Sequence, residues 1–473
     1  MLEKKLSIKN DFIITGLNGI GTVIGIFLVS GYLARSLGLD VLGEYLLLRR
    51  LVTAFLGVLL VGMNVTIPIL IAKNPNSAIG DASIIIFLFV TIPIIFLIQG
   101  LGNFYFFSYG LSFAHILFVL GFCLLTLTYS LYRGHFNMLG ANFLQLIAGT
   151  IVSIVASYIA SSLEEFLLIV GSSMLFISIF AFIRRNRGLH LKRITHYEIK
   201  SLITFGLARV PSFIFQFFML GGPPLLGLSY LTLVDQAFLN AGISLVRIFL
   251  IVVGPLGIIL LPRVSRVLSK GIDESLRKNL ALLIQLTLFY GSITSIALSQ
   301  FSNNILALWL GTSTSLASKT SEILLFSTPC FLLCAILKSP IDAIAHKGYN
   351  SLIYAIGVGG MIGTFLLMIA IDIEPILATA WAFFVGYLFS AIASYLVASK
   401  IFRLNIFSIE YIASIIIYNL TIYGIITLIP FEGNLRMFVS MSVFIILMSS
   451  CSLEGAMITK FGRQDKKAMS NEP

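Results

Sequence analysis

Residues 12–34 read FIITGLNGIGTVIGIFLVSGYLA and contain no charged side chain. A helix of about 20 mostly apolar residues is long enough to cross the hydrocarbon core of a bilayer. The stretch is too long for the apolar core of a signal peptide, and no small-residue cleavage site closes it. It therefore predicts a transmembrane helix that stays in the protein.

Similar apolar stretches recur along all 473 residues. Charged residues make up only 11% of the chain and mean hydropathy is +1.01, whereas a soluble protein carries roughly 25% charged residues. This composition excludes a soluble core and nucleic-acid binding, and four cysteines are too few for a disulfide scaffold. We expect an all-α polytopic membrane protein with about 14 transmembrane helices. The expected spans are 12–34, 43–72, 82–101, 108–132, 140–160, 164–183, 200–228, 233–262, 279–299, 322–345, 348–371, 376–399, 408–430 and 434–454.

The basic residues indicate the orientation of these spans. If the spans alternate, 23 of the 31 Lys and Arg residues share a side with the N-terminus, and only three lie on the opposite side. Cytoplasmic loops of membrane proteins carry the excess of Lys and Arg. Both termini are therefore expected to be cytoplasmic.

A unit of six helices is expected to occur twice. The second span of each half ends in a run from glycine to proline, VGMNVTIPILIAK at 61–73 and VGPLGIILLPRVSR at 253–266. Two six-helix lobes around a central cavity, plus two extra C-terminal helices, account for fourteen spans. The expected parts are an N-terminal lobe (1–183), a basic cytoplasmic loop (184–199), a C-terminal lobe (200–403), the two extra helices (404–455) and a cytoplasmic tail (456–473).

Glycine and proline interrupt the first span of each half. Proline removes a backbone donor and kinks or ends a helix. Interrupted helices at matching places in two halves point to the moving parts of a transporter. Close helix packing on glycine is the alternative, and it is favoured for the first span, whereas a helix break is expected in the seventh. The candidate hinge residues are Gly21, Gly25, Pro211, Gly221, Gly222, Pro223 and Pro224.

Away from the ends of the expected spans lie five basic side chains and one acidic side chain. A charge at this depth is costly and usually faces a cavity or a partner. Arg209 and Arg247 lie near the middle of their spans. Arg49 and Arg50 lie about 10 Å deep, where a long side chain can also reach back to the interface. The remaining pair, Lys338 and Asp342, is one helical turn apart and can form a structural ion pair.

Polar residues accompany the two deeper arginines on one helix face. Arg209 shares a face with Ser212 and Gln216, and Arg247 shares one with Ser244, Asn240 and Gln236. Such stripes favour a wet cavity, with an interhelical hydrogen-bond seam as the alternative. Because Arg binds phosphate or carboxylate through a two-point fork, surplus positive charge in the cavity favours an anionic amphiphile as the substrate.

The sequence holds no sign of a cofactor. It has no Walker A pattern, its histidines are scattered, and its cysteines have no metal-ligand spacing. Transport would then draw on an ion gradient or the membrane potential. Asp342 and Asp235 are the only candidates for ion coupling, and the coupling ion stays open.

Three runs resemble the Wzx-type polysaccharide flippases, within the multidrug/oligosaccharidyl-lipid/polysaccharide exporter superfamily. They are LARSLGLDVLGEYLLLRRL (33–51), LLPRVSRVLSKG (260–271) and ILALWLGTS…ILLFSTPCFLLCAILKSPIDAIAHKGYNS (305–351). The resemblance implies alternating access by two rocking lobes in the bacterial inner membrane. The implied substrate is an oligosaccharide repeat unit of O-antigen, lipopolysaccharide or capsule, joined to undecaprenyl diphosphate.

The resemblance also implies the residues and partners of the site. The matching cationic positions are Arg50, Arg209 and Arg247, together with Arg49 and Lys338. The implied partners are the lipid-linked substrate, the bilayer and other polysaccharide-assembly membrane proteins, without nucleic acid. Fourteen spans also resemble the peptidoglycan-precursor flippase, in which the extra helices form a groove for the lipid tail.

Four alternatives differ in class. A cation-coupled drug exporter of the same superfamily would call for buried carboxylates, and here the buried charges are mainly Arg. A polysaccharide polymerase or lipid-linked glycosyltransferase would need a sizeable outer catalytic loop, and no outer loop exceeds about 22 residues. A scramblase or scaffold would not need the Arg stripes. A flippase that is not an enzyme fits these features best.

Overall fold

The computed structural model describes residues 8–74, 77–97, 112–186, 194–207, 210–249, 274–344, 349–404 and 409–428. All regular secondary structure in these ranges is helical, which confirms the all-α fold class. The helices are α1 (Ile8–Ser36), α2 (Leu39–Leu59), α3 (Met63–Lys73), α4 (Ile79–Ile86), η1 (Phe87–Thr91), α6 (Phe113–Gly134), α7 (Met138–Leu144), η2 (Gln145–Ile151), α8 (Val152–Ile159), α9 (Leu163–Asn186), α10 (His196–Leu207), α11 (Val210–Leu226), α12 (Leu233–Ile248), α14 (Glu274–Ser299), α15 (Ser302–Leu310), α16 (Ser315–Phe326), α17 (Thr328–Ile344), α18 (Tyr349–Ala370), α19 (Pro375–Phe402) and α20 (Ile409–Leu428).

The helices are membrane-spanning in length and character. Within the described ranges nine of them are long and apolar enough to cross a membrane, and a tenth is gained when α2 and α3 count as one bent span. The first thirteen expected spans each overlap a helix or a helix pair, and the fourteenth, 434–454, lies outside the described residues. A lipid-facing stripe runs along α1 on its exposed side chains Ile13, Leu17, Ile20, Ile24 and Leu28.

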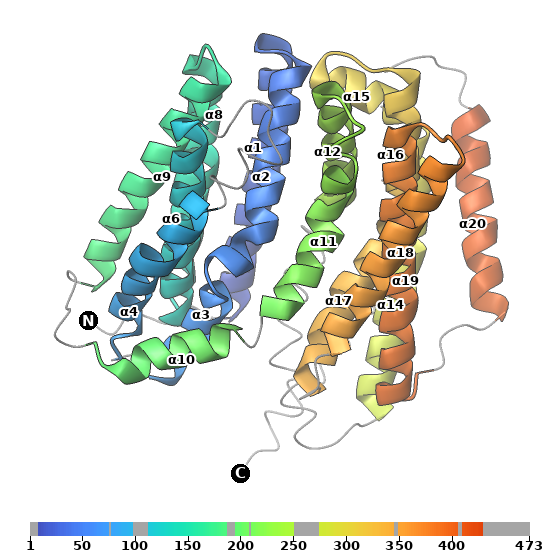
Figure 1. Ribbon diagram of the computed structural model, residues 1–473. Helices are drawn as coiled ribbons and strands as arrows, with labels where there is room; N and C mark the ends of the chain where they lie inside the picture. The colour runs from blue at the N-terminus through green and yellow to red at the C-terminus, as the bar shows by residue number, and fades with distance from the viewer. Residues whose placement is uncertain are drawn as a thin grey trace.

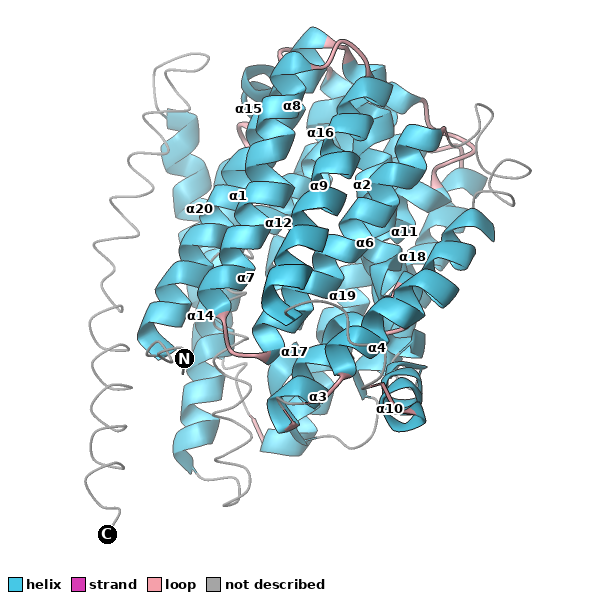
Figure 2. Cartoon of the chain, turned by 90° about the vertical axis from the view of Figure 1, so that its left-hand side faces the viewer, coloured by secondary structure: helices cyan, strands magenta, loops and turns pink. Residues whose placement is uncertain are grey.

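The helices form two groups that stand side by side (Figure 1). One group holds α1 to α9 and the other holds α11 to α20. The groups contact each other where α2 packs against α11 and α12 and where α1 packs against α15. The largest buried cluster draws side chains from both groups, including Tyr45, Phe166 and Phe383. The short helix α10 crosses the lower end beside α3 and α4 (Figures 1 and 2).

The bent pair α2 and α3 lies where the Gly62-to-Pro68 run was noted. The helix axis bends by 50° between α2 and α3. Val61 and Gly62 have positive φ angles of 48° and 72°, a conformation that glycine adopts at little cost. Gly206 of α10 packs into the bend, and a Cβ there would lie 1.9 Å from the Val61 carbonyl oxygen. The bend is therefore held by a backbone contact that only glycine permits.

Two expectations for the stretch 200–228 are wrong in detail. It forms two helices, α10 and α11, rather than one span. The helix does not break at Gly221-Gly222-Pro223-Pro224, because α11 continues through all four residues to Leu226. A side chain from the next helix provides a hydrogen-bond partner for a carbonyl group at the end of α11: the Gln236 amide donates to the Pro224 carbonyl oxygen at 3.0 Å.

The contact between α1 and α15 joins the two groups at the upper end of Figure 1. The Trp309 ring stacks on Phe27 with centroids 4.1 Å apart, and its indole nitrogen donates to the Phe27 carbonyl oxygen at 2.9 Å. The Arg35 guanidinium donates to the Leu308 carbonyl oxygen. We call these four residues the α1–α15 latch.

We expect Trp309→Ala to open the latch, because it removes both the ring stack and the hydrogen bond. Spin labels at Ser36 and Thr312, on a background without the native cysteines, should report a longer and broader distance than in the parent protein. The matched control is Trp381→Ala, since Trp381 is the other tryptophan of the chain and lies partly exposed on α19. An unchanged distance in Trp309→Ala would refute the role of the latch.

Candidate functional site

Arg50 is the most deeply buried cation at the contact between the two groups. Its side chain, on α2, is 7% exposed. One guanidinium nitrogen, Nη2, donates to the Asn240 carbonyl oxygen at 3.1 Å and to Ser244 Oγ at 3.3 Å, both on α12. The other two nitrogens, Nε and Nη1, are buried without a hydrogen-bond partner among the described residues. An unmet buried donor costs about 1–3 kcal/mol, so this arginine has spare capacity for an acceptor that is not part of the fold.

Further positive charge surrounds Arg50. Arg247 on α12 and Arg49 on α2 both lie close enough to act on it electrostatically. Tyr387 on α19 lies within the same reach of Arg50 and Arg247. None of the three arginines is paired with a carboxylate among the described residues. The cluster therefore carries uncompensated positive charge.

The polar face of α12 lies against this cluster. The Asn240 amide donates to the Gln236 carbonyl oxygen at 2.8 Å, and the Ser244 hydroxyl donates to the Asn240 carbonyl oxygen at 2.7 Å. The Asn240 side-chain oxygen is buried without a described partner. Asp235, at the start of the helix, is engaged in a capping box with Thr232, a local role that leaves it a weak candidate for ion coupling.

Arg49 faces a different direction from Arg50. It lines a small crevice between α1, α2 and η2, together with Thr22, Tyr45, Thr150 and Ser153. Adjacent helix residues point about 100° apart, so the crevice receives Arg49 while Arg50 reaches α12. Hydroxyl groups and one guanidinium share the lining with the apolar side chains of Ile26 and Val29, and the free volume of about 10 Å³ has room for about one water molecule.

A second polar network lies deeper in the same bundle. The Asn18 amide donates to Asn142 Oδ1 and Gln145 Oε1, both at 3.1 Å, and the Asn142 amide donates to Thr15 Oγ1 at 3.1 Å. The Asn18 oxygen has no described partner. The network ties α1 to α7 and η2, and it was not foreseen from the sequence. The spacing of Thr15, Asn18 and Thr22 along one face of α1 was the available signal.

The remaining expected site residues divide by position. Gln216 lies on α11 and is partly buried, and Lys338 lies on α17, where its carbonyl oxygen accepts from the Asn350 amide at 3.1 Å. Arg209 lies outside the described residues. Ser212 and Asp342 lie in α11 and α17, but their side chains are outside the described set.

The candidate hinge glycines of α1 lie in close packing. A Cβ at Gly21 would lie 3.0 Å from Leu146, and one at Gly25 would lie 2.2 Å from Thr150. The helix α1 is continuous through both. In the second bundle Pro211 lies in the first turn of α11, and the four residues at 221–224 are buried. Whether any of them acts as a hinge stays a prediction.

Tyr387 is the site residue that the sequence did not indicate. It is 3% exposed and its ring packs edge-on against Phe331 at 5.1 Å. Its neighbours in the chain are apolar, so no local pattern marked it. Across the described residues no group of three or more His, Cys, Asp or Glu side chains is placed to hold a metal ion.

These observations define a class: an all-helical membrane protein of two contacting bundles, with unpaired arginines between them. Solved structures of transporters in the multidrug/oligosaccharidyl-lipid/polysaccharide exporter superfamily share this fold. No protein-family model matches the chain, and no curated protein matches its sequence.

Three solved structures show the likeness. An inward-facing multidrug-resistance MATE transporter aligns with a TM-score of 0.67 at 12% identity, over 83% of this chain and 98% of its own. The lipid II flippase MurJ, in an inward closed conformation, aligns with a TM-score of 0.61 at 14% identity, over 92% and 99%. A mutant of the Vibrio cholerae MATE transporter VcmN aligns with 0.57 at 14% identity, over 84% and 97%. At these identities the likeness establishes the fold.

Proposed function

We propose that the protein is a flippase for a polyprenyl-diphosphate-linked oligosaccharide repeat unit. It would carry the unit from the cytoplasmic to the outer leaflet of the bacterial inner membrane by alternating access, with both termini in the cytoplasm. The lobes at 1–183 and 200–403 would rock against each other, and the product would be used for surface polysaccharide such as O-antigen.

The observation that supports this proposal is the unpaired guanidinium of Arg50. It lies between the two bundles with two nitrogens lacking a described partner, and Arg49 and Arg247 add charge around it. A diphosphate has several anionic oxygens that can each accept from these donors. Fixed arginines replace part of the hydration that such a head group loses when it leaves water. Arg209 and Lys338 are proposed as further contacts.

The sugar would pass between the bundles while the polyprenyl tail stays in the bilayer, and the helices at 404–455 are proposed to lie beside that tail. The lipid II flippase MurJ, which shares the fold, is named for a lipid-linked substrate.

The competing proposal is a cation-coupled drug exporter, which the MATE transporters of the same fold represent. A cationic drug would meet repulsion from Arg50, Arg247 and Arg49. We therefore rank this alternative second, and a membrane-embedded polysaccharide polymerase third.

We expect Arg247→Ala to abolish surface polysaccharide in cells that depend on this protein, while the variant remains in the membrane. The reason is the loss of one of the guanidinium groups that would hold the diphosphate. Surface polysaccharide and membrane-inserted protein are measured in the same cells. The matched control is Arg403→Ala, since Arg403 is an exposed cation that follows α19.

Full restoration of surface polysaccharide by the Arg247→Ala variant would refute the argument that these arginines line a substrate cavity. If deletion of the gene for this protein leaves surface polysaccharide unchanged and raises the sensitivity of the cells to cationic drugs, the exporter alternative replaces the flippase. Both outcomes are read from the same strains.

A further inference from the structure

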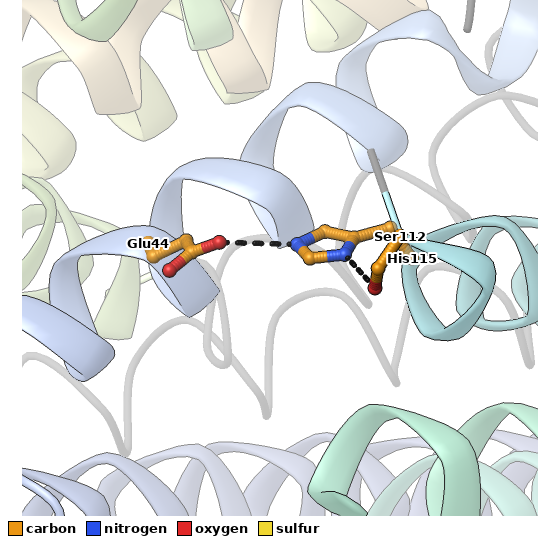
Figure 3. A network of polar contacts seen from close by, with 3 residues as sticks. All are labelled: Glu44, Ser112 and His115. Atoms are coloured by element: carbon orange, nitrogen blue, oxygen red, sulfur yellow. Dashed lines mark hydrogen bonds and ion pairs between the residues drawn. The ribbon is translucent and has the colours of Figure 1, made fainter. Parts of the chain in front are cut away.

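Three residues form a continuous polar chain between α2 and α6 (Figure 3). The His115 ring nitrogen Nε2 lies 3.1 Å from Glu44 Oε1, and Nδ1 lies 2.8 Å from Ser112 Oγ. His115 is in the first turn of α6, and Ser112 is the residue before that helix. The His115 side chain is 8% exposed, whereas that of Glu44 is 36% exposed. The chain therefore runs from a partly exposed carboxylate to a buried imidazole.

The arrangement satisfies His115 in both of its charge states. In the neutral ring, Nε2–H donates to Glu44 and Nδ1 accepts from the Ser112 hydroxyl. In the charged ring, both nitrogens donate, and the Ser112 hydroxyl rotates to accept from Nδ1–H. Uptake of a proton therefore loses no hydrogen bond and places a full positive charge beside the Glu44 carboxylate.

Glu44 is next to a close backbone contact between the two bundles. A Cβ at the preceding residue, Gly43, would lie 1.9 Å from the Leu233 carbonyl oxygen at the start of α12. Consecutive residues of α2 therefore contact the other bundle and the histidine. A shift of α2 relative to both α6 and α12 at this end would change both contacts together.

Other charged groups do not compete for His115. Its neighbours on α2 are Asp40, which is exposed one turn earlier, and Arg49 and Arg50, which lie further along the helix. On α9, Glu164 is exposed at the same end, and Glu165 accepts from the backbone nitrogen and hydroxyl of Ser161. Arg184 and Arg185 lie in the last turn of α9. The described parts of α3, α7 and η2, which also pack on α6, bring no charged side chain to this end. Among the described charged groups Glu44 alone is paired with the ring.

We propose that His115 is a proton-binding site that controls the contact between the two bundles at this end of α2. Proton uptake turns the His115–Glu44 hydrogen bond into an ion pair, which holds α2 in the position where Gly43 touches α12. Loss of the proton weakens that hold and favours separation of α2 from α12. The ligand is a proton, and the inference does not depend on what the protein transports.

The test uses the full chain in liposomes, with spin labels at Leu39 on α2 and Ser229 before α12, without the native cysteines. The label distance is measured over a series of pH values and should lengthen as the pH rises and the proton is lost. His115→Gln should show a distance that does not change with pH. His196→Gln, at an exposed histidine on α10, should behave like the parent.

A second variant separates proton binding from loss of structure. Glu44→Gln keeps a group that can hydrogen-bond the ring but removes the charge, so it should reduce the pH response while the protein stays folded. A parent protein without a pH-dependent distance overturns the proposal, and so does a His115→Gln variant that keeps the full response. Neither result bears on the flippase assignment, because no substrate is present.

Discussion

Replacing Arg50 by methionine is expected to abolish transport without lowering the melting temperature of the protein. Buried guanidinium donors without partners destabilise a fold, and an apolar residue of similar length in place of a buried charge is often neutral or stabilising. If the proposed diphosphate accepts from Nε and Nη1 of Arg50, the loss of these two charge-assisted bonds corresponds to at least about a 100-fold fall in rate. The rate is measured with a fluorescent lipid-linked diphosphate in liposomes that contain the purified protein.

The melting temperature and the rate together decide what Arg50 does. If Arg50→Met lowers the melting temperature sharply but transports at the rate of the parent, then Arg50 is a structural residue that stabilises the α2–α12 contact. The matched control is Arg133→Met, because Arg133 lies in the last turn of α6, outside the contact between the bundles. It should leave the rate near that of the parent.

A Gly43→Val substitution is expected to have the second largest effect. The added Cβ would meet Leu233 at 1.9 and 2.7 Å and the Ala237 nitrogen at 3.3 Å, and all of these are backbone atoms that cannot swing away. Overpacking of this kind typically costs about 1–3 kcal/mol. Because the cost falls only on the arrangement in which α2 touches α12, the variant should populate the separated arrangement and lose transport.

The distance between labels at Leu39 and Ser229 checks this result, and the transport rate is measured on the unlabelled variant. Gly16→Val is the matched control, since a Cβ at Gly16 of α1 meets nothing within 4 Å. A Gly43→Val protein with the parent distance and rate would show that the close approach has no part in the cycle.

The course of the chain through the membrane follows from the sequence because each apolar stretch is a separate, local signal. Short helices escape that signal. The twelve residues of α10 and the nine of α15 are below the length that marks a span. The sequence pattern therefore merges α10 into the stretch 200–228 and leaves α15 in the connection between two expected spans. The tandem prolines at 223 and 224 mislead for another reason: they do not break the span in its middle, because α11 runs through them and ends at Leu226.

The candidate site was only partly readable. The sequence places Arg49 and Arg50 on different faces of one helix, but only the packing of α2 on α12 decides which of them reaches the other bundle. Tyr387 joins the cluster from more than 130 positions away in the chain, and His115 meets Glu44 across 71 positions. Contacts of that kind come from the fold and leave no local pattern.

The π-helical segments η1 and η2 have a consequence for how the molecule moves. In the described residues both occur in the first bundle. A π turn holds one residue more than an α-helical turn, so it is a local defect in the hydrogen-bond pattern of the helix. Such a defect can advance along the helix one residue at a time, because each hydrogen bond that breaks ahead of it is remade behind. Among the described residues, two spans of the first bundle therefore carry such a defect, and we expect motion of this bundle relative to the second to begin at these two segments.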